Sequence, residues 1–346
     1  MQSSNLTTTT SPTHNRSGRM VAMDALKCFA IFTVLMGHCI QYFLSSDYND
    51  EPGYRLIYSF HMPLFMMITG FFFVKTLRDG FIETMVKKAR QLLLPVISWG
   101  AIWMFLRMCD GQSWKVIYDI WIGNNGFWFL KSAFICSLIG YFVFCNKTAN
   151  LLIGGIFTLL ISQFITRFQI DFMYPCFFAG GLLALKDATC TKVQKLIIPA
   201  AVLFIALLIF LNADLYKAAK LAQLSAIYKI GAEGIALRLY LIAMGVSGAI
   251  FFVAIFNKYL NSNADSKVLH IISDIGGYTL GIYIIQSIIL EWALAKFINF
   301  DSFSPLTFNF IIVPLLSIAI LIPIYLILRT IKKVPYLSFL LLGTKK

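Results

Sequence analysis

The sequence predicts an all-α, polytopic transmembrane helix bundle of about ten spans with both termini in the cytoplasm. Apolar residues make up 59% of the chain and charged residues 13%, whereas soluble domains are about 45–50% apolar and about 25% charged. The mean hydropathy is +0.77. The 346 residues hold about ten spans of about 20 residues with short loops, which leaves no room for a soluble catalytic domain.

Ten apolar segments follow one another along the chain, separated by short polar stretches. An acidic loop with Pro52 separates the first segment from the second. The basic run KKARQ, followed by Pro95, marks the start of the third segment, and IKKV with Pro335 follows the last one. We expect spans at about 20–44, 57–77, 92–109, 127–145, 149–166, 170–186, 195–211, 236–256, 275–295 and 306–328.

The basic residues give this arrangement an orientation. With a cytoplasmic N-terminus, 18 of the 29 Lys and Arg residues lie on the inner side and 10 on the outer side, while Lys27 lies inside the first segment. This distribution satisfies the positive-inside rule. The net charge of +13 is therefore mainly a topology signal, and we expect no nucleic-acid partner.

The remaining stretches carry weaker signals. Residues 1–18, rich in Ser and Thr, are expected to form a disordered cytoplasmic tail, followed by a single transmembrane domain at 19–343. The outer connection at 212–235 predicts a helix on the membrane surface. No cleavable signal peptide is expected. The seven cysteines include no CxxC pair, so they are interpreted as packing residues and no metal site is expected.

The first apolar segment carries three ionisable residues on one face. Lys27 and His38 are eleven residues apart, which is three helical turns plus about 20°, and Asp24 precedes Lys27 by three. Ionisable groups inside a membrane are costly unless they face protein or water, so they are functional candidates. We therefore predict catalytic roles for all three.

A second histidine is expected near the first. His61 lies near the outer start of the second segment, and His38 lies near the outer end of the first, so the two imidazoles should share one depth. A neutral imidazole takes a proton from an attacking hydroxyl and returns it later. His61 joins the predicted catalytic set, although both histidines are also open to interpretation as buried packing residues.

A basic run lies at the inner end of the third segment. Lys87, Lys88 and Arg90 would hold the phosphates of a nucleotide-bearing acyl donor such as acyl-CoA. The alternative is ordinary topology and contact with anionic membrane lipids.

Aromatic and acidic residues near the outer side are candidates for substrate binding. We single out Trp128 in GFWFL, Tyr283 in GGYTLGIYIIQ and Glu291 in the ninth segment. Arg107 and Arg238 could line the same cavity, but snorkelling to the interface accounts for both arginines adequately.

These motifs resemble those of the membrane-bound acyltransferase 3 family, ten-helix enzymes that acylate bacterial cell-surface and exported glycans. The resemblance runs over residues 19–343 and rests on the order and spacing of the motifs. They are MDALK with the downstream histidine, FHMPLFMMITGFFF, KAR, GFWFL, YPCFFAGGLLA, GGYTLGIYII and PIYLILRTIKKVPYLSFLLLG.

The resemblance implies roles for particular residues. His38 would be the essential catalytic histidine, Lys27 its paired basic residue, and Lys88 with Arg90 part of the acyl-CoA site. The chain departs from the family at three places: Lys27 and Lys88 stand where Arg is common, and Gln286 stands where the ninth helix often has His. Lys lacks the bidentate geometry with which Arg binds phosphate.

The sequence thus predicts an inner-membrane acyltransferase, most simply an O-acetyltransferase, that uses cytoplasmic acyl-CoA. The acceptor would be a hydroxyl of a cell-envelope or exported glycan or glycolipid, with acetyl-CoA as the donor substrate and no permanently bound cofactor. Other copies of the chain or proteins of envelope-glycan biosynthesis are expected partners. The alternatives are a proton-coupled transporter or flippase of a glycolipid or small anion, and a non-catalytic assembly subunit.

Overall fold

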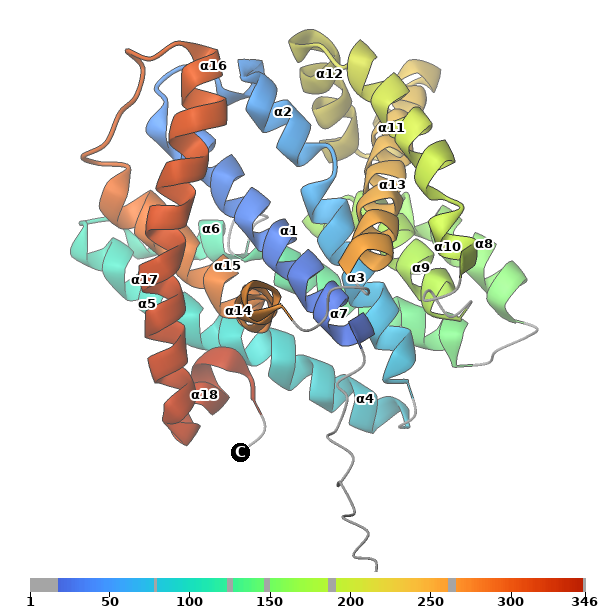
Figure 1. Cartoon of the computed structure of the whole chain (residues 1–346), viewed down its shortest axis with the longest axis horizontal. Helices are drawn as coiled ribbons and strands as arrows, with labels where there is room; N and C mark the ends of the chain where they lie inside the picture. Colours follow the sequence, from blue (N-terminus) through green and yellow to red (C-terminus); the bar gives the residue numbers. More distant parts are fainter. Residues whose placement is uncertain are drawn as a thin grey trace, which may run out of the picture.

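The computed structural model of the chain is all-helical, with no strand among the residues that it describes (Figure 1). These residues are 18–77, 80–122, 127–145, 150–185, 191–260 and 266–344. The predicted tail, apart from Gly18, lies outside them, as do His14 and Cys190. Six basic residues used for the orientation also lie outside: Arg16, Arg78, Lys147, Lys186, Lys345 and Lys346.

The prediction of a multi-span helical membrane protein is confirmed. Within the described ranges, six helical segments are long and apolar enough to cross a membrane, and there are up to eight if two bent helix pairs each count as one span. Two shorter apolar helices complete the set. Each of the ten predicted segments coincides with one of these helices.

The α-helices in chain order are α1 (Gly18–Phe43), α2 (Pro52–Tyr58), α3 (His61–Lys75), α4 (Phe81–Lys88), α5 (Leu94–Cys109), α6 (Trp114–Ile122), α7 (Trp128–Phe144), α8 (Asn150–Ser162), α9 (Ile170–Leu185), α10 (Thr191–Gln194), α11 (Ile197–Phe210), α12 (Ala213–Leu224), α13 (Ala232–Leu260), α14 (Lys267–Gly276), α15 (Thr279–Ile288), α16 (Pro305–Thr307), α17 (Val313–Lys333) and α18 (Pro335–Leu342). Short 3-10 turns are η1 (Tyr48–Asp50), η3 (Arg167–Gln169) and η4 (Ile227–Lys229). Three π-helical turns are η2 (Ala89–Leu93), η6 (Ile289–Leu294) and η7 (Phe308–Ile312).

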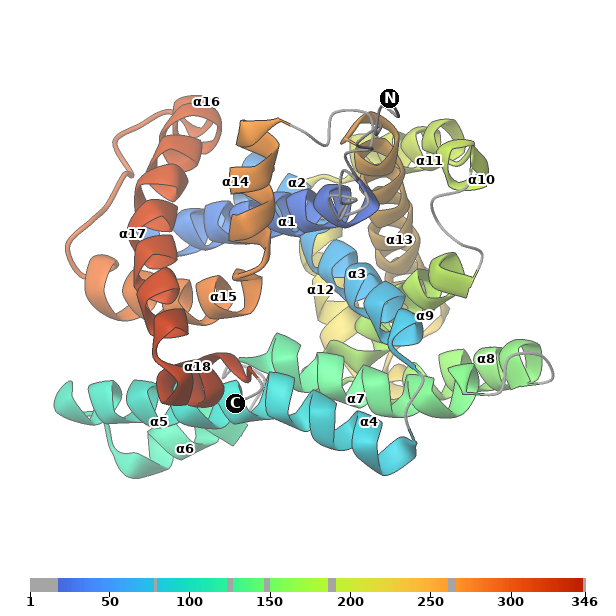
Figure 2. The same ribbon diagram turned by 60° about the horizontal axis from the view of Figure 1, so that its bottom comes forward.

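Helix α1 occupies the centre of the bundle (Figures 1 and 2). It packs against α2 and α3 on one side and against α13, α14, α15 and α17 from the second half of the chain. Gly276 of α14 lies directly on the Asp24 carbonyl, where a Cβ would collide with it. Small residues at such crossings let helix backbones approach closely. The backbone of α1 at Asp24 is therefore in direct contact with α14.

Two glycines fix the position of α3 against α9. A Cβ on Gly70 would collide with the Phe177 carbonyl, and a Cβ on Gly180 would collide with the Met67 carbonyl. The two backbones thus touch at reciprocal points, and their crossing cannot slide without opening a void. This contact sets the register of α3, which carries His61 at its start.

Two of the π-helical turns have a visible cause in the sequence. In η2 the Leu94 N–H bonds the Ala89 carbonyl, and the next residue is Pro95. In η7 the Val313 N–H bonds the Phe308 carbonyl, and the next residue is Pro314. Because proline has no N–H, one carbonyl of the preceding turn loses its helical partner, and the turn widens.

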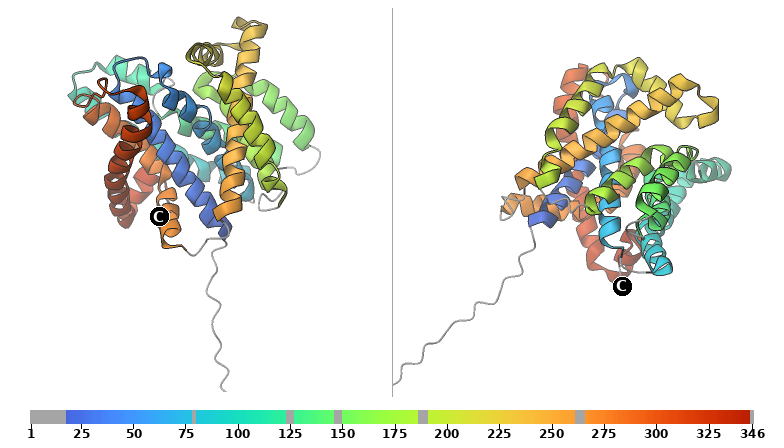
Figure 3. Two further views of the ribbon diagram at one scale, coloured as in Figure 1. Left: turned by 45° about the horizontal axis from the view of Figure 1, so that its top comes forward. Right: turned by 90° about the vertical axis from the view of Figure 1, so that its right-hand side faces the viewer.

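The connection at 212–235 contains a helix as predicted, α12, and its side of the membrane stays a prediction. It is bent by 106° from α11, and Figure 3 shows its neighbours α11 and α13 from two further sides. It is not only a surface helix, because Tyr216 is buried against the ring of Tyr54. Lys217 ties α12 to η1 through Asp47 at 2.9 Å and Asp50 at 2.7 Å.

The Asp47 carboxylate is the most strongly bonded group of this outer contact. The backbone N–H of Asn49, and then the Lys217 ammonium, lower the pKa of Asp47 to about 2. Both partners stabilise the charged form. The carboxylate therefore stays ionised at any ordinary pH.

Candidate functional site

The structure separates the charges of α1 into two places. Lys27 Nζ lies 2.8 Å from Asp24 Oδ1, and the side chains are 23% and 28% exposed. His38 lies eleven residues further on, about 16 Å along the helix axis. Asp24 and Lys27 are thus brought together, whereas neither reaches His38.

His38 and His61 become neighbours through Tyr58. Gly37 of α1 faces the Tyr58 ring, because a Cβ there would lie 2.8 Å from Tyr58 Cε2. The same ring packs against the His61 imidazole, with centroids 4.4 Å apart. Gly37, which directly precedes His38, and the His61 imidazole thus lie against the same tyrosine ring.

The hydrogen bond of His61 defines which nitrogen carries the proton. Nδ1 lies 2.7 Å from the Ile57 carbonyl oxygen. A carbonyl only accepts, so we infer that Nδ1 carries the proton and that Nε2 of the neutral ring has a free lone pair. The side chain is only 1% exposed. His61 is therefore held in one tautomer, with Nε2 as the proton acceptor.

His38 is less constrained than His61. Its ring stacks on Tyr42, one turn further along α1, with centroids 5.8 Å apart. Its Nδ1 is buried and has no partner among the described residues. The residue as a whole is only partly buried, although α1 lies at the centre of the bundle. A buried polar atom without a partner is uncommon in proteins and marks a position where a substrate group could bond.

Several residues of this cluster are absent from the sequence prediction. Tyr54 stacks on Tyr58, with ring centroids 3.9 Å apart, and the Tyr58 hydroxyl lies 3.4 Å from Gln41 Oε1. Helical spacing is the signal that could have found two of them. Tyr58 precedes His61 by three residues and Tyr42 follows His38 by four.

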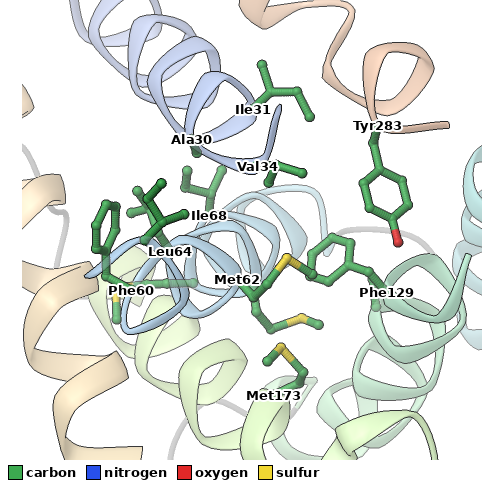
Figure 4. Packing of buried hydrophobic residues seen from close by; sticks show 14 of the residues in the cluster. Ala30, Ile31, Val34, Phe60, Met62, Leu64, Ile68, Phe129, Met173 and Tyr283 are labelled. Carbon is green, nitrogen blue, oxygen red and sulfur yellow. The ribbon is translucent and has the colours of Figure 1, made fainter. Parts of the chain in front are cut away.

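The predicted aromatic residues also meet, but through an intermediate ring. The Tyr283 hydroxyl points toward Phe129 (Figure 4), and their ring centroids lie 6.0 Å apart. Trp128 packs edge-on against the same Phe129 ring and is partly exposed. Phe127 just before them has φ 47° and ψ 39°, a strained conformation for a residue with a side chain. The motifs GFWFL and GGYTLGIYIIQ therefore form one wall.

Glu291 and Arg107 form an ion pair across the bundle. Arg107 Nη2 donates to Glu291 Oε1, and the guanidinium lies over the Trp103 ring at 4.5 Å. Glu291 lies within η6, and a second pair, Lys296 Nζ to Asp110 at 2.8 Å, joins the same two segments. Arg107 thus has a carboxylate partner on another helix, which the snorkelling interpretation does not include.

Snorkelling is the wrong explanation for Arg238. The side chain is 2% exposed, and its Nη1 lies 3.5 Å from Oδ2 of the fully buried Asp171. Its guanidinium also donates to the carbonyls of Gln163, Ala222 and Ser225. Arg238 therefore ties three segments together in the interior, and it does not line the histidine cluster.

The predicted basic run is divided between two faces. It lies in the first part of one helical segment that runs from Phe81 to Cys109. Lys88 points toward α3, with Nζ 5.5 Å from the centroid of the Phe73 ring. Lys87 and Arg90 line an open groove along α4 instead.

Arg90 is positioned by the end of the chain. It lies in η2, and its carbonyl is covered by Gly343, where a Cβ would collide. Trp99 Nε1 donates to the Leu341 carbonyl at 2.9 Å, which fixes α18 on α5. The Arg90 Nε is buried with no partner among the described residues.

Two points of the sequence analysis remain, the surroundings of Gln286 and the question of a metal site. Gln286 is fully buried, and its Oε1 has no partner in the described part of the chain. No group of three or more His, Cys, Asp or Glu residues within that part could hold a metal ion.

Comparison with known proteins gives one match over most of the chain. A family model described as an acyltransferase domain matches residues 20–329. The nodulation protein NolL of Mesorhizobium japonicum is 30% identical over 132 residues, 36% of this chain and 35% of that protein. The nodulation protein NolL of Sinorhizobium fredii is 34% identical over 90 residues, 25% of each chain. The matches thus span about a third or less of these relatives. No solved structure matches.

Proposed function

The chain belongs to the acyltransferase 3 family, and from this membership we propose that it is an O-acetyltransferase of the bacterial inner membrane. It would transfer acetyl from cytoplasmic acetyl-CoA to a hydroxyl of a cell-envelope or exported glycan or glycolipid. The two similar relatives come from bacteria. Membership makes the chain a membrane acyltransferase, while donor, acceptor and compartment belong to the proposal.

The observation that carries the proposal is the approach of the His38 segment of α1 to His61 at Tyr58. The His61 imidazole packs on the Tyr58 ring, and Gly37, next to His38 in α1, faces the same ring. A general base must lie within hydrogen-bond reach of the proton that it removes. An imidazole with a defined acceptor nitrogen, beside a second imidazole with an unpartnered buried nitrogen, meets that requirement.

The proposed chemistry needs one base and one leaving thiolate. The acceptor oxygen attacks the thioester carbonyl carbon while His38 takes the hydroxyl proton. The carbon–sulfur bond then breaks, and the imidazolium returns the proton to the sulfur. The products are an O-acetyl ester and free CoA, so atoms and charges balance. His61 acts as the second imidazole of the site.

The donor would bind at the opposite end of α1. Cations there come from three helices, with Lys27 on α1, Lys87 and Lys88 on α4, and Arg90 in η2. Phosphates are bound by such clusters through charge-assisted hydrogen bonds. The thioester would extend from there along α1, over the distance of about 16 Å that separates Lys27 from His38.

The acceptor would bind against the aromatic wall. Trp128 and Tyr283 offer faces on which a sugar ring packs. Glu291 contributes through its pair with Arg107, which leaves one carboxylate oxygen for an acceptor hydroxyl.

The test is thiol release by the purified full chain in detergent, with acetyl-CoA and a panel of glycan acceptors. The wild type should release CoA in an acceptor-dependent manner. The His38→Ala variant should lose that release and still insert into membranes, and the exposed His270→Ala should keep it. Full activity in His38→Ala would overturn the role of His38. Acceptor-driven proton uptake into vesicles without CoA release would favour transport instead.

A further inference from the structure

Three consecutive phenylalanines, Phe71 to Phe73, lie near the end of α3, and a lysine ammonium lies over each of their rings. The Lys27 Nζ of α1 lies 4.2 Å from the Phe72 ring centroid. The Lys88 Nζ of α4 lies 5.5 Å from the Phe73 ring centroid. The third ring, Phe71, carries Lys75 of α3 itself at 4.9 Å.

Helix geometry explains why neighbouring rings reach different helices. Successive residues of a helix point about 100° apart, so the rings of Phe72 and Phe73 diverge toward α1 and α4. Phe73 is fully buried, and the glycine contact between α3 and α9 fixes the rotation of α3 at Gly70. The Phe73 ring is therefore held by its surroundings, and the Phe72 ring, which is partly buried, faces α1.

A ring holds an ammonium without consuming its hydrogen-bond donors. The face of an aromatic ring attracts a cation through its quadrupole, whereas the three N–H groups of lysine remain directed at acceptors. Lys88 has no carboxylate within ion-pair distance among the described residues. Lys27 uses one bond on Asp24 and keeps donors for another anion.

We infer that Phe72 and Phe73 are positioning residues of the donor site, which hold Lys27 and Lys88 as two arms of one polyanion-binding site. This inference rests on the proposed function and names the phosphates of acyl-CoA as the groups that the arms receive. Lys27 thereby serves the donor end of α1, and its contribution to the rate passes through donor binding.

The test compares acetyl-CoA with S-acetylpantetheine, which keeps the thioester and the pantetheine arm but lacks both the phosphates and the adenosine of CoA. Phe72→Leu and Phe73→Leu should each raise the KM for acetyl-CoA about tenfold, with kcat within about threefold, because the lysines lose their supports. The KM for S-acetylpantetheine, which has no phosphate, should stay unchanged. Phe72→Tyr keeps a ring and should restore the wild-type KM.

The matched control is Phe144→Leu, which removes a ring that is 2% exposed and packs on Phe178. It should leave both KM values unchanged. Equal increases with the two donors in the Phe72 and Phe73 variants would overturn the inference, because they would show a packing role alone. An unchanged KM for acetyl-CoA would overturn it as well. A wild type that does not turn over acetyl-CoA contradicts the proposed function itself.

Discussion

The ring of Tyr58 lies almost perpendicular to the imidazole of His61, with centroids 4.4 Å apart and an interplanar angle of 74°. Its other edge lies against Gly37 of α1. Tyr58 is thus a wedge between the helix that carries His38 and the ring of His61. A shift of this wedge should move both imidazoles relative to each other.

Substitutions of Tyr58 that remove its ring should lower kcat, whereas those that keep the ring should not. Tyr58→Leu should lower kcat about tenfold or more, since misplacement of about 1 Å costs up to about 10²-fold, whereas Tyr58→Phe should stay within about threefold. Gly37→Ala should resemble the Leu variant, because its Cβ lies 2.8 Å from Tyr58 Cε2. Gly80→Ala, with nothing within 4 Å, is the control in steady-state assays. A strong defect in Tyr58→Phe would instead assign the role to the hydroxyl.

Because Nδ1 and Nε2 of His61 have different roles, a substitution can test the catalytic role without removing the structural hydrogen bond. An Asn side chain places an N–H near the position of Nδ1 and can keep the bond to the Ile57 carbonyl, but it lacks a basic Nε2. His61→Asn should therefore fold and lose about 10²–10⁴-fold in kcat. The measurement is thiol release together with a detergent melting curve. Near-normal turnover in a well-folded His61→Asn variant would make His61 a packing residue.

The contact of Gly343 with Arg90 should control donor affinity. Gly343→Ala pushes a Cβ into the Arg90 carbonyl and should raise the KM for acetyl-CoA several-fold. Gly111→Ala is the matched control, since Gly111 has φ +78° like the +64° of Gly343 but nothing within 4 Å. Both substitutions carry a backbone cost of about 1 kcal/mol. Equal KM effects would leave the Arg90 contact without a role in donor binding.

The buried Arg238–Asp171 pair should matter for stability. Arg238→Ala should destabilise the bundle by about 3–5 kcal/mol, because Asp171 is left charged and uncompensated in the interior. Lys296→Ala breaks a pair whose members are 48% and 31% exposed and should cost about 0–1 kcal/mol. Thermal unfolding in detergent measures both. Similar melting temperatures for the two variants would contradict this assignment.

The contact between α12 and η1, formed by Lys217 with Asp47 and Asp50, should lose stability only at low pH. Asp47 has a pKa of about 2 in the folded protein and about 3.9 when unfolded. Its depressed pKa adds stability that is present above about pH 3.9 and is lost as the pH falls through about 2. Hydrogen exchange of α12, corrected for intrinsic rates, should show the loss. Asp47→Asn should abolish this dependence, and opening of α12 near pH 6 would contradict it.

Local sequence signals were sufficient for the helices and for the pairing of Asp24 with Lys27. Apolar length predicts a span without knowledge of its neighbours, and residues three apart on a helix meet regardless of the fold. The proximity of His38 and His61 followed from one short loop. These relationships depend on few residues between the partners.

Relationships across the bundle could not be predicted in the same way. Arg107 and Glu291 are 184 residues apart, and neither carries a local signal for the other. Asp171 was not singled out, because one acidic residue at a segment boundary is unremarkable until Arg238 is placed on it. The divided orientation of the basic run depends on the rotation of α4, which contacts with α3 and α7 determine.

The central position of α1 has a consequence for synthesis in the cell. Helix α1 is synthesised before α13, α14, α15 and α17, which it contacts in the folded protein. It is therefore in the membrane before most of the helices that it contacts. Asp24 and Lys27 can pair within α1 at that stage, which lowers the free-energy cost of placing both charges in the membrane. His38 stacks on Tyr42 of the same helix, and its neighbour Gly37 meets Tyr58 of α2, so this part of its surroundings does not depend on the later helices.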